Sequence, residues 1–242
     1  MDYNRIVMAT IEVFRKCDVH SFPIDCAELL KHYGYRLFSY KDLRDRNPEL
    51  YNLSLEYSED AFRAGTSMII AYNPDRPRGR IRFSLMHELG HHVLGHAGSS
   101  AENEKEANAF ASHILAPRMA IHYSKCKNAN DVALLFNMSF EAADNAFIDY
   151  RRWHRIVVIY KMSAVDKAMY THFYNKEQKC FVWSRQTCCF CGKVIYNSME
   201  SHCKICTLPP APKEYKRYDP KSFCDDNDII LRRQHLKWLY DF

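Results

Sequence analysis

Two histidines and a glutamate within the pentapeptide His87-Glu88-Leu89-Gly90-His91 have the residue types and spacing of a metal site. Positions four apart lie on one face of a helix, so both imidazoles can reach one ion. Zinc binds histidine nitrogen, polarises a carbonyl and lowers the pKa of bound water. The carboxylate between the histidines can accept a proton from that water. The pentapeptide therefore predicts a catalytic zinc at His87 and His91, with Glu88 as general base.

The third protein ligand of such a zinc is expected on the next helix. A histidine in this role requires the spacing His-Glu-x-x-His-x-x-Gly-x-x-His, and His96 stands one residue too early for it. The candidates are therefore Glu102, Glu104 and Glu106. Small residues follow Glu106 and would let its helix press against the first, so we expect Glu106 to be the ligand. His92 and His96, also four apart, are expected to have hydrogen-bonded or surface roles.

A second group of potential metal ligands lies near the C-terminus, where five of the ten cysteines fall within 188–206. The pattern Cys188-x-x-Cys191 followed by His202-x-x-x-Cys206 gives two ligand pairs separated by a short loop, as in a closed tetrahedral zinc site. We therefore expect a structural zinc held by Cys188, Cys191, His202 and Cys206, with Cys203 as the alternative to His202. A closed site has no open position, so its role is folding or recognition.

The surroundings of this cysteine cluster are basic and aromatic, and they continue into the tail beyond residue 208. Such a surface is compatible with nucleic acid, and equally with a peptide-binding or purely stabilising module. The formal charge of +5 permits an acidic partner but does not require one. Clustered cysteines, no secretory signal at the N-terminus and no apolar run of about 20 residues together predict a cytoplasmic protein without a membrane span.

The predicted elements place the His-Glu-x-x-His motif on a helix beside a small sheet. Asp25 and Glu28 have capping-box spacing, and Gly34 ends the helix that they begin. Apolar periodicity and breaker residues predict helices at 3–16, 25–33, 80–94, 102–115, 131–136 and 140–151, and strands at 35–40, 67–72, 156–162 and 180–183, with a polar loop containing Pro48 between the first two strands.

The motif segments together resemble the ImmA/IrrE family of metallo-endopeptidases over roughly residues 1–155. The stretches that carry the resemblance are 87–96 (HELGHHVLGH), 106–111 (EANAFA) and 115–117 (LAP), with 69–73 and 80–84 upstream. The resemblance implies a minimal zincin fold, zinc ligands His87, His91 and Glu106, and Glu88 as base. It also implies that the substrate is a helix-turn-helix repressor of a mobile element or stress regulon, cleaved in the cytoplasm.

The expected architecture is α+β. A zincin-like metallopeptidase domain of small twisted sheet and active-site helix spans 1–125, and a helical, helix-turn-helix-like segment spans 126–155. A strand-containing C-terminal region spans 156–242, with the zinc finger at 186–207. The expected function is that of a zinc endopeptidase, with one catalytic and one structural zinc. The alternative is a non-catalytic DNA- or protein-binding regulator whose zincin site is vestigial.

Overall fold

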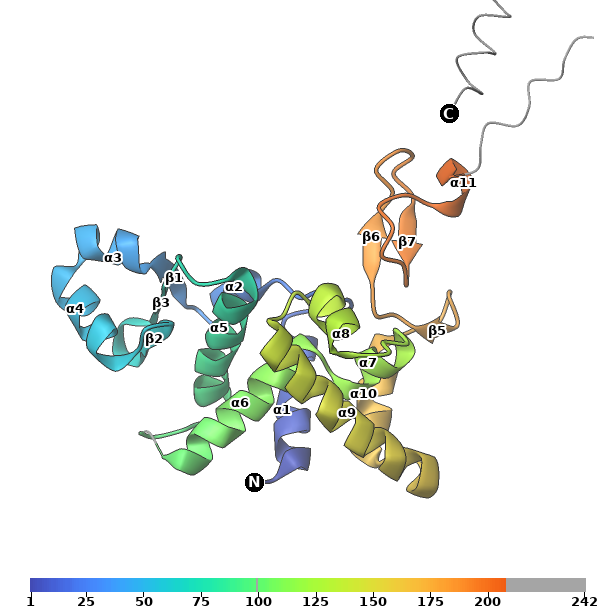
Figure 1. The fold of residues 1–242 in the computed structure, drawn as a ribbon, viewed down its shortest axis with the longest axis horizontal. Helices are drawn as coiled ribbons and strands as arrows, with labels where there is room; N and C mark the ends of the chain where they lie inside the picture. The colour runs from blue at the N-terminus through green and yellow to red at the C-terminus, as the bar shows by residue number, and fades with distance from the viewer. Residues whose placement is uncertain (99, 208–242) are drawn as a thin grey trace, which may run out of the picture. The chain divides into compact units, whose positions relative to one another are not determined.

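A computed structural model describes residues 1–98 and 100–207 of the chain. The chain is divided into two units, and the boundary lies between Ser201 and His202. Among the described residues, the first unit combines helices with a three-stranded sheet and two small two-stranded sheets (Figure 1). This combination confirms the predicted α+β class. The predicted C-terminal region beyond residue 207, including its basic tail, lies outside the described residues.

The larger sheet consists of β1 (Arg36–Ser39), β2 (Ala61–Ala64) and β3 (Ile69–Tyr72), in the order β1-β3-β2. β3 is parallel to β1 and antiparallel to β2. The central strand is buried, with Ile70 and Ala71 fully enclosed. The strands predicted near β1 and β3 are confirmed, and β2 adds an edge strand that was not predicted.

The segment predicted to be a polar loop forms two helices, α3 (Tyr40–Arg46) and α4 (Pro48–Tyr57), so that prediction was wrong. Ser39 and Asp42 form a capping box at the start of α3. The Asn47 side chain accepts a hydrogen bond from the first turn of α4, and Pro48 occupies that turn. Both starts are typical helix signals. The prediction of a loop gave more weight to the high charge of the segment than to these signals.

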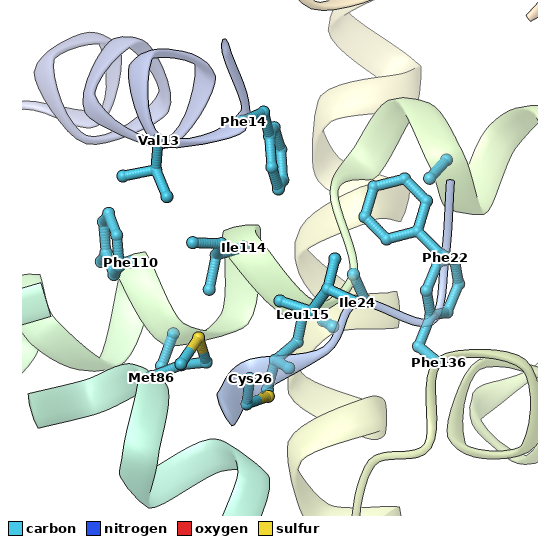
Figure 2. Packing of buried hydrophobic residues seen from close by; sticks show 14 of the residues in the cluster. Val13, Phe14, Phe22, Ile24, Cys26, Met86, Phe110, Ile114, Leu115 and Phe136 are labelled. Carbon is cyan, nitrogen blue, oxygen red and sulfur yellow. The ribbon is translucent and has the colours of Figure 1, made fainter. Parts of the chain in front are cut away.

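The N-terminal helices α1 (Tyr3–Lys16) and α2 (Cys26–His32) agree with the prediction. Two further predicted helices, α5 (Arg78–Val93) and α6 (Ala101–Leu115), are also present and pack on each other. Figure 2 shows Val13 of α1, Met86 of α5 and Phe110 of α6 in one buried cluster. The helix that carries the His-Glu-x-x-His motif is therefore fixed by the central core.

The helical segment after α7 (Arg118–Tyr123) consists of α8 (Ala129–Phe136) and α9 (Phe140–Tyr160). α9 continues to Tyr160 and so contains most of the predicted strand at 156–162. The strand prediction was therefore wrong, and the predicted boundary after residue 155 lies inside the helix. β-branched residues lower helix propensity only slightly, so a helix already formed can extend through such a run.

The remaining elements are small. α10 (Ala164–Phe173) packs on α1, and β4 (Tyr174–Asn175) pairs with β5 (Cys180–Phe181). β6 (Arg185–Thr187) and β7 (Val194–Tyr196) form an antiparallel hairpin. In the second unit, the described residues include α11 (Lys204–Thr207). No helix within the described ranges is both long and apolar enough to cross a lipid bilayer.

Candidate metal centre

Gly90 sets the distance between the motif helix α5 and its neighbour α6. A Cβ atom at this position would lie 3.0 Å from Cδ1 of Phe110 and 3.3 Å from Cα of Ala107. Ordinary carbon contacts are longer, so glycine lets the two helix backbones approach closely. This close packing brings side chains of α6 within reach of His87 and His91 on α5.

Three side chains converge where the two helices meet. Nε2 of His87 lies 3.0 Å from Nε2 of His91 and 3.2 Å from a carboxylate oxygen of Glu104. The other carboxylate oxygen of Glu104 lies 3.5 Å from Nε2 of His91. Ligand atoms at ~2.0–2.1 Å from a tetrahedral zinc are about 3.3 Å apart. The three groups therefore have the spacing of ligands to one ion.

Hydrogen bonds on the far side of the rings decide which nitrogens carry protons. The amide oxygen of Asn108 can only accept, and it lies 2.9 Å from Nδ1 of His87, so this Nδ1 carries the proton and Nε2 keeps its lone pair. Burial, followed by the charge of His87, lowers the pKa of His91. His91 is thus neutral near pH 7. Two imidazole Nε2 atoms directed at one point suit a shared cation.

Glu88 lies beside this group and faces the same cleft. Its side chain is largely buried, and a carboxylate oxygen lies 3.7 Å from Nε of Arg63 on β2. Burial raises the pKa of Glu88 to about 7, with the charge of Glu104 adding to the rise and that of Arg63 opposing it. A carboxyl group with a pKa near neutrality can both accept and donate a proton at physiological pH.

Glu106, the third ligand expected from the sequence, faces a different part of the molecule. It is buried, and its carboxylate lies 3.2 Å from Nε2 of His96 and 3.2 Å from a guanidinium nitrogen of Arg5. Positions 104 and 106 are about 200° apart around a helix, so only one of them can face α5. The geometry therefore differs from the sequence-based choice and favours Glu104. The third candidate, Glu102, is exposed and lies 3.4 Å from the N-terminal amine.

The histidines and Glu88 line an open cleft of about 1590 Å³. Typical small-molecule pockets are about 300–1,000 Å³, so this cleft has room for a longer ligand. The edge strand β2 contributes one wall and α9 another. The wall residues outside the metal group include Phe62, Arg63, Glu141, Asn145 and Arg152.

The cysteine cluster gives a second group that could hold a metal ion. Its members are Cys188, Cys191, Cys203 and Cys206. His202, the ligand favoured from the sequence, is not in this group, and its stated alternative Cys203 is. Cys203-x-x-Cys206 repeats the spacing of Cys188-x-x-Cys191, and a site of four thiolates is a usual form of structural zinc.

Sequence reasoning did not identify Asn108 or Arg63 as parts of the site, and for His96 it predicted a hydrogen-bonded or surface role without naming its partners His91 and Glu106. Asn108 stands four residues after Glu104, a spacing that places both on one helix face, so a signal for it was present. Arg63 gave no such signal, because its approach to Glu88 depends on how β2 lies against α5.

A comparison with protein families gives a match within the chain. Residues 42–147 match a peptidase family model described as the IrrE N-terminal-like domain. The matched segment contains β2, β3, α5, α6 and all three side chains of the metal group. No curated protein and no solved structure matches the chain.

Proposed function

Since residues 42–147 are an IrrE N-terminal-like domain of a metallopeptidase family, we propose that this protein is a zinc-dependent endopeptidase acting on a protein substrate. The observation that carries the proposal is the group of His87, His91 and Glu104, spaced as ligands of one ion next to Glu88. Three protein ligands and a free fourth position are the usual arrangement of a catalytic zinc.

The proposed ligands are Nε2 of each histidine and the carboxylate of Glu104. Zinc bound there would polarise the scissile carbonyl and acidify a water molecule. The chain's own contribution is preorganisation. Asn108 holds the ring of His87 with its lone pair directed inward, and the close approach of α6 at Gly90 keeps Glu104 in reach.

Glu88 is the proposed proton carrier. Its carboxylate takes a proton from the attacking water as the oxygen of that water forms a bond to the carbonyl carbon. It then delivers the proton to the amide nitrogen as the carbon–nitrogen bond breaks, so that the products are a carboxylate and an amine. Arg63, 3.7 Å away, favours the ionised form of Glu88 that starts this cycle.

The proposed substrate is a helix-turn-helix repressor in the cytoplasm, as the resemblance to the ImmA/IrrE family implies. The size and openness of the cleft support a polypeptide rather than a small molecule. Side chains of both charges line it, and Arg63, Arg152 and Glu141 are among them. A substrate segment with mixed charge therefore fits better than a uniformly acidic or basic one.

We also propose a structural zinc at the four cysteines of the C-terminal cluster, with Cys203 in place of His202. Such a closed site contributes to folding or recognition and not to hydrolysis. The basic residues around the cluster support a role of this module in binding nucleic acid.

The test compares wild type with Glu88→Gln on a peptide library made by digesting a whole proteome, with new chain ends detected by mass spectrometry. We expect wild type to cut the library and to lose this activity when zinc is removed. Glu88→Gln should keep its metal content and cut at least 100-fold more slowly. Equal cleavage by the variant would exclude the proposed base. Wild type that holds its metal but cuts nothing would favour a non-catalytic regulator.

A further inference from the structure

A chain of three side chains leads away from the ring of His91 on the side opposite Glu104. Nδ1 of His91 lies 3.0 Å from Nδ1 of His96, and Nε2 of His96 lies 3.2 Å from a carboxylate oxygen of Glu106. A guanidinium nitrogen of Arg5 lies 3.2 Å from the same oxygen. Three elements, α5, α6 and α1, therefore meet behind this one ring.

The charges along this chain determine where each proton lies. The carboxylate of Glu106, paired with Arg5, accepts a hydrogen bond from Nε2–H of His96. In this tautomer Nδ1 of His96 accepts from Nδ1–H of His91. His91 is left with its lone pair on Nε2, the atom that faces His87 and Glu104.

The backbone after α5 folds specifically to bring His96 into this position. Gly95 has φ +70°, a left-handed conformation that residues with a Cβ rarely adopt. The backbone N–H of His96 donates to the carbonyl of His91 at 3.0 Å, and Arg5 also donates to the carbonyl of Leu94 at 2.8 Å. The His96 and Glu106 side chains are only 5% and 9% exposed, so water does not compete for these bonds.

We propose that His96, Glu106 and Arg5 are positioning residues that fix the tautomer and ring orientation of His91 for metal binding. The inference rests on the metal site of the proposed function. In it Glu106 orients a ligand through His96 and does not bind the metal itself. Loss of a hydrogen-bond partner on the second ring nitrogen of a metal-ligating histidine typically lowers metal affinity 10- to 100-fold.

The experiment measures the zinc dissociation constant of the full-length protein by competition with a chromophoric chelator. The variants are His96→Ala, Glu106→Gln and the double variant. His92→Ala serves as a control, because His92 is the neighbour of His91 on α5 but bonds to Tyr35 instead. Glu102→Gln is the second control, since this glutamate of α6 is exposed. The double variant His87→Ala/His91→Ala gives the baseline for zinc held elsewhere in the chain.

We expect His96→Ala and Glu106→Gln each to weaken zinc binding at this site by about 10- to 100-fold, with both controls unchanged. The double variant should bind no more weakly than His96→Ala alone, because Glu106 acts through His96. The visible spectrum of bound Co²⁺ should change in the same variants. If His96→Ala does not fold, Glu106→Gln decides the question.

Zinc affinities of His96→Ala and Glu106→Gln that equal those of the controls would overturn the inference, as would additive losses in the double variant. Peptide cleavage plays no part in these measurements. Tight zinc at the histidine site without peptidase activity would therefore remove the proposed function and leave this inference standing.

Discussion

The amide oxygen of Asn108 lies 2.9 Å from Nδ1 of His87, so a residue of α6 orients a proposed zinc ligand on α5. The bond crosses the interface that Gly90 makes possible. Because a residue of α6 orients a ligand on α5, metal affinity depends on how the two helices pack. The first three predictions use this dependence.

Removal of the Asn108 amide should weaken zinc binding. In Asn108→Ala the ring of His87 loses the acceptor that fixes its proton on Nδ1, so we expect roughly a 10-fold loss of zinc affinity. Asn108→Asp keeps an acceptor at the same place and should retain or exceed wild-type affinity. The measurement is chelator competition, and equal affinities for Asn108→Ala and wild type would contradict the prediction.

The choice between Glu104 and Glu106 as metal ligand can be decided directly. Glu104→Gln removes a charged group that lies 3.2 Å and 3.5 Å from the two histidines, so it should reduce zinc affinity by roughly 10-fold more than Glu106→Gln does. Metal content after dialysis reports the difference. A greater loss in Glu106→Gln would restore the ligand expected from the sequence.

A methyl group at position 90 should push α5 and α6 apart. Alanine is favoured over glycine within a helix by about 1 kcal/mol, so Gly90→Ala would stabilise the protein if space allowed. The contacts of 3.0 Å and 3.3 Å leave too little space, and we expect a net loss of about 1–3 kcal/mol in the free energy of unfolding. Urea unfolding measures it, and a stabilised variant would show that the helices are less tightly packed.

The fourth ligand of the cysteine cluster is tested by two substitutions. Cys203→Ser should lose about one zinc per chain, because a hydroxyl is a poor replacement for a thiolate ligand, whereas His202→Ala should keep its zinc. Metal analysis of the purified proteins provides the comparison. Loss of zinc from His202→Ala alone would support the site of three cysteines and one histidine.

His113 should make folding stability depend on pH. It is buried on α6, with Tyr3, Arg118 and Asp149 around it. Burial, and then the charge of Arg118, lower its pKa to about 4, although Asp149 lies 3.8 Å away. That carboxylate is already bound by two guanidinium nitrogens of Arg118 at 2.5 Å and 2.7 Å, so it does little to hold a proton on His113.

The folded protein thus keeps His113 neutral, while the unfolded chain protonates it below a pH of about 6.5. Stability is therefore complete above that pH and falls as the pH drops toward 4. From pH 7 to pH 5 wild type should lose about 2 kcal/mol more than His113→Gln, which cannot titrate there. Urea unfolding at the two pH values measures both losses. Protonation of the metal site affects both proteins equally, so it cancels in the difference between them. Equal losses would contradict a neutral, buried His113.

Local signals in the sequence were sufficient for some elements and misleading for others. The helices α1, α2, α5 and α6 follow from apolar spacing and capping residues. The run Ile156–Tyr160 was interpreted as a strand from its β-branched residues, yet it continues α9. Such residues indicate a strand only where a neighbouring strand supplies hydrogen bonds, and a sequence does not show which neighbours a segment has.

The sequence by itself determined that His87 and His91 share one face of a helix with Glu88 beside them, because a spacing of four residues is a local property of helix geometry. Only the tertiary structure decided that Glu104 meets those histidines while Glu106 lies behind His96. Both glutamates stand on one helix, and the face of α6 that turns toward α5 is set by long-range packing at Gly90 and Phe110. Small residues in α6 indicate that two helices can pack closely, but the sequence alone does not show which face of α6 turns toward α5.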